Sequence, residues 1–211
     1  MIDSYDKLTI GKYEEIKAVL TSDKDDVEMN VEIVGILTDL TAEDVLELPI
    51  GTFNTLLQST AFLYNEPTKR QVAQLYNLGG YELIPVLNVN DMTTAQFLDY
   101  QEYIKSDNLI GILSVFLIPK GCTYGNNYDV YEIQNVIKNN LSIVDARSLS
   151  DFFFAWFQGL FHSTLTYLTK KIKKMEKKAK TQEEKKKMEE ALASLADVGD
   201  GYQWLIQSVK Q

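Results

Sequence analysis

Apolar residues recur every three or four positions over residues 8–64 and again over residues 91–168. This spacing places them on one face of a helix, so both stretches are predicted to be helical. Between them the pattern changes, because Gly79 and Gly80 separate two short apolar runs. That arrangement predicts a β-hairpin in which the glycines take positive φ. Pro85 cannot donate to a ladder, so its strand is expected to lie at an edge or to end there.

Helix starts can be placed from short polar motifs. A Ser or Thr can cap the first turn of a helix when an acidic or amide side chain three residues later reaches back to it. Four pairs have this spacing: Thr41 with Asp44, Thr93 with Gln96, Ser142 with Asp145, and Thr181 with Glu184. We therefore expect a helix to begin after each of these Ser and Thr residues.

The two helical stretches share short motifs in the same order. Three pairs of segments correspond: Val34–Leu37 with Ile110–Leu113, Leu40–Asp44 with Leu141–Asp145, and more weakly Thr9–Tyr13 with Thr93–Phe97. Self-similarity of this kind predicts a duplicated helical unit that buries its apolar face against its twin.

The last segment has a heptad pattern. Six apolar residues are separated alternately by four and three positions: Phe161, Leu165, Leu168, Ile172, Met175 and Ala179. Met188, Leu192 and Leu195 continue the same spacing in a second helix. Two antiparallel helices packed through these positions are predicted, in the manner of a coiled coil.

These patterns together predict a mainly α-helical protein. It consists of two related helical units with a small β-hairpin between them and a C-terminal antiparallel helical hairpin. The expected boundaries are residues 1–70 for the first unit, 71–90 for the hairpin linker, 91–168 for the second unit, and 169–211 for the basic hairpin arm with a docking segment.

The net charge of −9 is unevenly distributed. Residues 170–190 contain ten lysines against five glutamates, and the remaining residues carry a net charge of −14. The basic arm begins with six lysines: Lys170, Lys171, Lys173, Lys174, Lys177 and Lys178. An acidic body is not drawn to nucleic acid as a whole, but the arm could contact phosphate or the acidic surface of a neighbouring copy.

No catalytic arrangement is recognised. His162 precedes Ser163, but adjacent helical residues point in different directions, so they cannot act as base and nucleophile. Cys122 lies in a polar loop with only Lys120 as a cationic neighbour, which gives little reason for a reactive thiolate. We found no phosphate-binding loop, dinucleotide fingerprint or calcium loop. The chain is therefore predicted to be no enzyme and to have neither cofactor nor metal site.

The segment 152–157 is strongly aromatic and is followed by Lys170 and Lys171, as at the end of a membrane span. Polar residues interrupt it, and a spanning helix needs about 20 mostly apolar residues, so a buried helix is predicted instead. No secretory signal is expected at the acidic N-terminus. The predicted partner-binding residues are Phe153, Trp156 and Phe157 together with Tyr202, Leu205, Ile206 and Val209.

Over residues 8–168 the chain resembles small structural and assembly proteins of tailed bacteriophages, especially crAss-like and related phages of gut bacteria. The resemblance is carried by five segments: Leu8–Tyr13, Thr41–Pro49, Met92–Asp99, Ile112–Pro119 and Asp151–Phe153. It implies a tail-assembly chaperone or a neck or tail component, found in the virion or in the host cytoplasm during assembly. The basic arm is outside the resemblance.

The leading hypothesis is accordingly a non-enzymatic phage structural or assembly protein that acts through protein–protein contacts. Its expected partners are other virion or assembly proteins, and in a homo-oligomeric ring the acidic body of one copy would meet the basic arm of the next. The alternative is a packaged cargo protein whose lysine-rich arm contacts nucleic acid.

Overall fold

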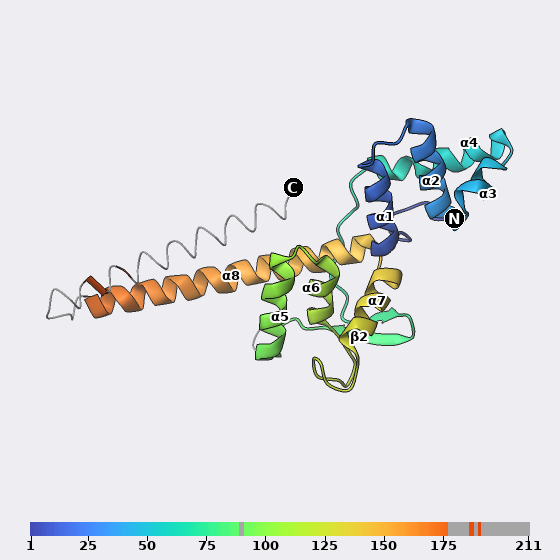
Figure 1. Cartoon of the computed structure of the whole chain (residues 1–211). Helices are drawn as coiled ribbons and strands as arrows, with labels where there is room; N and C mark the ends of the chain where they lie inside the picture. The colour runs from blue at the N-terminus through green and yellow to red at the C-terminus, as the bar shows by residue number, and fades with distance from the viewer. Residues whose placement is uncertain (89–90, 177–185, 188–189, 191–211) are drawn as a thin grey trace. The chain divides into compact units, whose positions relative to one another are not determined.

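The computed structural model describes residues 1–88, 91–176, 186–187 and 190. The chain divides into two compact units, Met1–Ser150 and Asp151–Gln211. The described elements are mostly helices, with one small antiparallel sheet (Figure 1). The prediction of a mainly α-helical protein with a small β-hairpin is confirmed.

The first unit begins with two helices that lie side by side, α1 (Ile10–Leu20) and α2 (Asp26–Thr38) (Figure 1). The Asp25 carboxylate caps α2 by accepting hydrogen bonds from the backbone N–H groups of its first turn. Such bonds satisfy donors that have no partner within the helix. The helix ends at Asp39, whose φ of 59° turns the chain sharply toward the next element.

Two short helices and a 3-10 turn follow: α3 (Ala42–Leu46), α4 (Ile50–Ser59) and η1 (Thr60–Tyr64). Val45 of α3 packs on Val31 and Val34 of α2, and apolar residues of α4 lie partly buried against this cluster. No residue of α4 is fully buried. Ile50 at the start of α4 is exposed, whereas the other large apolar residues of this helix are half-buried.

The sheet has three strands in the order β1 (Tyr76–Leu78), β2 (Tyr81–Pro85) and β3 (Leu117–Pro119), all antiparallel. Gly79 and Gly80 form the turn between β1 and β2 with φ values of 53° and 87°. The hairpin is therefore confirmed, and β2 ends at Pro85 as predicted.

The third strand was not predicted, because the sequence places Leu117 and Ile118 in one apolar run with the preceding helix. That helix, α6 (Leu109–Phe116), gives way at Leu117, which has extended backbone angles and pairs with Pro85. The residue before a proline disfavours helical angles, so Pro119 helps to keep this segment extended.

Helices α5 (Thr94–Lys105), α6 and α7 (Val130–Asn140) pack in sequence, α5 on α6 and α6 on α7. The predicted capping boxes at Thr41 and Thr93 are both formed. Gln96, which completes the second box, is buried, and its Nε2 donates to the Val115 carbonyl oxygen at 2.9 Å. The start of α5 is therefore fixed to α6 by the residue that caps it.

Helix α8 (Ile143–Glu176) starts in the first unit and continues into the second. Ser142 caps it as predicted, since its Oγ accepts from the Asp145 backbone N–H at 3.1 Å. Thr181 with Glu184, and the second helix expected around Met188–Leu195, lie outside the described residues. The assignment of residues 1–70 and 91–168 as related units stays a prediction.

Candidate functional site

The N-terminal segment of the first unit pairs with the connection between α7 and α8. The backbone N–H of Ile10 donates to the Leu141 carbonyl at 3.1 Å, and that of Ile143 donates to the Leu8 carbonyl at 2.8 Å. All four side chains are almost fully buried. Burying apolar side chains beside satisfied backbone groups makes this junction a stable point of the unit.

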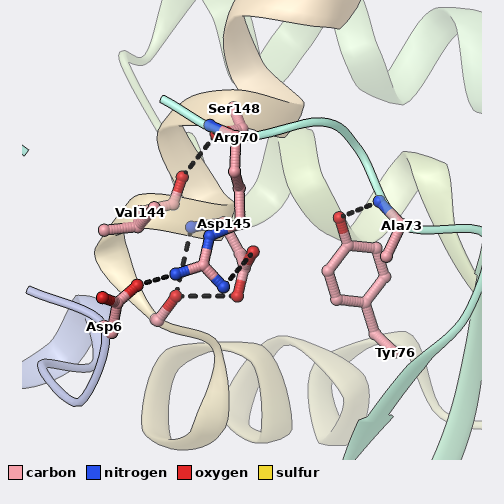
Figure 2. A network of polar contacts seen from close by, with 8 residues as sticks. Asp6, Arg70, Ala73, Tyr76, Val144, Asp145 and Ser148 are labelled. Carbon is pink, nitrogen blue, oxygen red and sulfur yellow. Dashed lines mark hydrogen bonds and ion pairs between the residues drawn. The ribbon is translucent and has the colours of Figure 1, made fainter. Parts of the chain in front are cut away.

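A polar network covers the same junction (Figure 2). The Arg70 guanidinium forms ion pairs with the carboxylates of Asp6 and Asp145, the second with 3.6 Å between Nη1 and Oδ1. The backbone N–H of Arg70 donates to Ser148 Oγ at 3.1 Å, and that hydroxyl donates to the Val144 carbonyl at 2.8 Å. Arg70 therefore ties three distant segments together.

Tyr76, at the start of β1, anchors the other end of the segment that begins at Arg70. Its hydroxyl accepts a hydrogen bond from the Ala73 backbone N–H at 3.0 Å (Figure 2). Burial raises the pKa of the Tyr76 phenol above its usual value. A guanidinium stays protonated in proteins, so the network around Arg70 is suited to binding and anchoring and not to proton transfer.

A groove of about 340 Å³ lies between α1 and the C-terminal half of α2. Its lining combines charged and apolar residues: Lys12, Glu15, Glu32, Gly35, Ile36, Asp39, Leu40 and Ala42. Two of the acids are paired, since Lys12 Nζ lies 2.6 Å from Asp39 Oδ1 and Lys24 Nζ lies 2.5 Å from Glu32 Oε1. Among the described residues, Glu15 has no ion-pair partner. The groove thus combines apolar residues with charged residues that are predominantly acidic.

A third polar group involves the loop before α7. The Tyr124 hydroxyl donates to Asp99 Oδ2 at 2.7 Å. Burial raises the pKa of Tyr124, and the hydrogen bond to the Asp99 carboxylate raises it further. Cys122 in the same loop is half-buried and has a free thiol. The Tyr124 contact fixes this loop to α5.

The aromatic residues predicted to bind partners have different exposures. Phe153 is buried, whereas Trp156 is half-buried and stacks on Phe152 with 6.2 Å between ring centroids. Phe157 and His162 belong to α8, but their side chains lie outside the described part of the structure. Phe153 therefore presents no surface to a partner in this structure, whereas Phe152 beside it is exposed. The partner-binding role of the aromatic segment stays a prediction.

The described lysines of the basic arm, Lys170, Lys171, Lys173 and Lys174, are exposed at the C-terminal end of α8. Lys171 Nζ lies 6.0 Å from the ring centroid of Tyr167, a cation–π distance. The remaining predicted residues lie outside the described residues: Lys177, Lys178, Tyr202, Leu205, Ile206 and Val209.

Within the described ranges, no three His, Cys, Asp or Glu residues gather as metal ligands would. None of the helices in this part of the chain has the length and hydropathy needed to cross a membrane. Sequence reasoning missed both the Arg70 network and the α1–α2 groove. The unequal charge distribution along the sequence predicts an acidic body, but it does not predict which helices bring the acidic side chains together.

Comparison with protein-family models, with curated proteins and with solved structures finds no match for this chain.

Proposed function

We propose that this chain is a non-enzymatic structural or assembly protein of a tailed bacteriophage and that it acts through protein–protein contacts. The observation that supports this most directly is the open apolar surface of α3 and α4. Leu46 is 69% exposed and Ile50 is 73% exposed. Leu46 ends α3 and Ile50 begins α4, so both lie beside the same short connection, where one partner protein could cover them. We call Leu46 and Ile50 the α3–α4 surface.

The way in which these helices pack explains why the α3–α4 surface stays open. Phe53, Leu56 and Leu57 of α4 pack against the cluster of Val45 and α2, whereas Ile50 is not part of this packing and stays exposed. The Pro49 residue that precedes Ile50 sets the direction of α4 but provides no side-chain cap. A partner protein that covered this surface would remove apolar area from water, which stabilises a complex.

The proposal predicts that the chain is found with tail or neck proteins of a phage. Mass spectrometry of purified particles and of assembly intermediates, both taken from infected cells, tests this. A retained component would be present in the particles in a defined copy number, whereas a transient chaperone would be present only in the intermediates. Absence from both fractions would contradict the proposal.

A matched pair of variants tests whether the α3–α4 surface makes the contact. Ile50→Glu places a charge on this surface, and Tyr131→Glu places one on α7, where Tyr131 is 72% exposed. Both residues are solvent-exposed, so neither substitution should unfold the protein. Only Ile50→Glu is expected to remove the chain from particles or intermediates. Equal incorporation of both variants would place the contact elsewhere.

Nucleic-acid binding is the second candidate function, and the exposed lysines at the end of α8 favour it. Phosphate contacts made by Lys170, Lys171, Lys173 and Lys174 would give binding that weakens steeply as salt increases. A DNA-binding titration at low salt, repeated after substitution of these four lysines by glutamine, tests it. The absence of binding by the unsubstituted chain at low salt would remove this candidate.

A further inference from the structure

The two units of the chain have opposite net charges. Residues 1–150 contain ten Lys and Arg against 22 Asp and Glu, a net charge of −12, whereas residues 151–211 have a net charge of +3. Opposite charges on separate surfaces of one protein attract neighbouring copies head to tail.

On the basic unit, three of the described lysines share one side of α8. Lys170, Lys173 and Lys174 are related by helical spacing of three and four residues, which places them on the same face. All three are exposed, whereas Leu168 and Ile172 on the opposite side are half-buried. We call Lys170, Lys173 and Lys174 the lysine face. The lysine face lies opposite the heptad positions. A helix that packed on the heptad positions as in a coiled coil would therefore leave the lysine face exposed.

On the acidic unit, the α1–α2 groove offers the complementary features. Glu15 is exposed, and no ion pair satisfies its charge within the described residues. Glu32 and Asp39 have ion-pair partners, but both pairs are partly open to solvent and can be rearranged at small cost. Ile36 and Leu40 in the groove can contact the methylene chains of lysine side chains, whose charged ends then reach the acids.

We propose that the α1–α2 groove binds the lysine face of α8 from a second copy of this chain. The interaction is a helix-in-groove contact in which charge sets the partner and the orientation. The groove and the lysine face are different surfaces, so each copy keeps one of each after pairing. Such a heterologous contact continues from copy to copy and closes into a ring or extends as a filament.

This inference names a second copy of the chain as one specific partner. It rests on the proposed function in one respect, namely that the chain acts through protein–protein contacts. The two can fail separately. Self-association is measured on the purified full chain, whereas the phage proposal depends on the composition of particles and intermediates.

Charge reversal with mixing provides the test. The groove variant carries Glu15→Lys and Glu32→Lys, and the arm variant carries Lys170→Glu and Lys174→Glu. In each variant alone, the groove and the lysine face have charges of the same sign. Each exposed ion pair that is lost weakens association by about 1.4- to 5-fold, and each reversed charge adds repulsion. Association of either variant alone should therefore weaken by more than about tenfold. In an equal mixture, every groove meets an arm of opposite charge, and association should return.

Sedimentation velocity over a concentration series gives the readout. The unsubstituted chain should associate at about 0.1 M salt and dissociate at about 1 M, where charges are screened within about 3 Å. Two control variants change the net charge equally at other exposed sites: Glu66→Lys with Glu102→Lys, and Lys105→Glu with Lys120→Glu. Both controls should associate like the unsubstituted chain.

Several outcomes would overturn the inference. One is an unsubstituted chain that stays monomeric at both salt concentrations. A second is a groove or arm variant that associates as strongly as the unsubstituted chain. A third is a mixture that stays monomeric although each groove in it can meet an arm of opposite charge. Recovery in the mixture would also demonstrate that both variants are folded.

Discussion

Gly111 of α6 lies against the ring of Tyr103 from α5. A Cβ atom added to Gly111 would lie 2.5 Å from Tyr103 Cδ1 and 2.6 Å from its Cγ. Carbon atoms in favourable contact are about 3.5–4.0 Å apart, so Gly111→Ala would require the ring or the helix to move by about 1 Å. The substitution therefore tests how tightly these two helices are packed.

The expected change in stability follows from three contributions. Replacing glycine in a helix by alanine favours the folded state by up to about 1 kcal/mol. Overpacking costs about 1–3 kcal/mol. Moving the ring also disturbs the hydrogen bond of 3.0 Å from Gln134 Nε2 to the Tyr103 hydroxyl, and a bond of this kind is worth about 0.5–1.5 kcal/mol. The unfavourable contributions are larger, so we expect the free energy of unfolding to fall by about 1–3 kcal/mol.

Urea unfolding followed by circular dichroism measures this change. Gly51→Ala on α4 is the matched control, because no atom lies within 4 Å of the added Cβ, and it should stabilise the protein by about 0.5 kcal/mol. In a Tyr103→Ala background the obstruction is gone, so Gly111→Ala should there be neutral or stabilising. A Gly111→Ala protein as stable as the unsubstituted chain would refute the argument, as would an equal loss in both backgrounds.

Three further substitutions probe the polar contacts of the first unit. Ser142→Ala removes the N-cap of α8 and should lower the free energy of unfolding by about 1 kcal/mol in urea titrations; an unchanged value would mean that the cap contributes nothing. Tyr124→Phe removes the hydrogen bond to the Asp99 carboxylate and should cost about 1.5–3 kcal/mol at neutral pH. Folding raises the pKa of Tyr124 above the ordinary phenol value of 10.0, so the contribution of Tyr124 is complete below about pH 10 and is lost as the pH rises further. The difference in the free energy of unfolding between the two proteins should therefore shrink above about pH 10, and a constant difference would contradict this. Arg70→Met breaks two partly exposed ion pairs and should cost about 1 kcal/mol, less at about 1 M salt; a loss independent of salt would point to packing instead.

The helix starts could be predicted because their determinants are local. Thr41 and Thr93 each form a capping box with a side chain three residues later. Such a motif needs only the helix that it starts, so neither the tertiary fold nor a distant partner changes it. The turn of the hairpin could be predicted for the same reason, because Gly79 and Gly80 themselves adopt the positive φ that the turn requires.

The third strand and the Arg70 network depend on residues that are distant in sequence. Leu117 becomes extended beside Pro85, a pairing that no spacing within 109–118 encodes. Arg70 lies in a segment without apolar periodicity, and its partners Asp6 and Asp145 come from opposite ends of the first unit. Only the packed fold brings these charges together.

The α1–α2 groove shows the same limitation for the candidate site. The sequence indicates an acidic body, because net charge is a property of composition. It does not indicate that Glu15 and Glu32 line one groove, since that depends on how α1 packs on α2. The lysine face was easier to anticipate, because lysines three and four residues apart on one helix share a side whatever the helix packs against.

The pairing of Leu8 and Ile10 with Leu141 and Ile143 has a consequence for biosynthesis. A ribosome releases the N-terminal segment first, and its backbone partners leave the exit tunnel only after nearly the whole first unit has been translated. Until then the nascent chain must carry Leu8 and Ile10, which are buried in the finished unit, without their final neighbours. The emergence of residues 141–143 from the exit tunnel is therefore the step at which this unit can close.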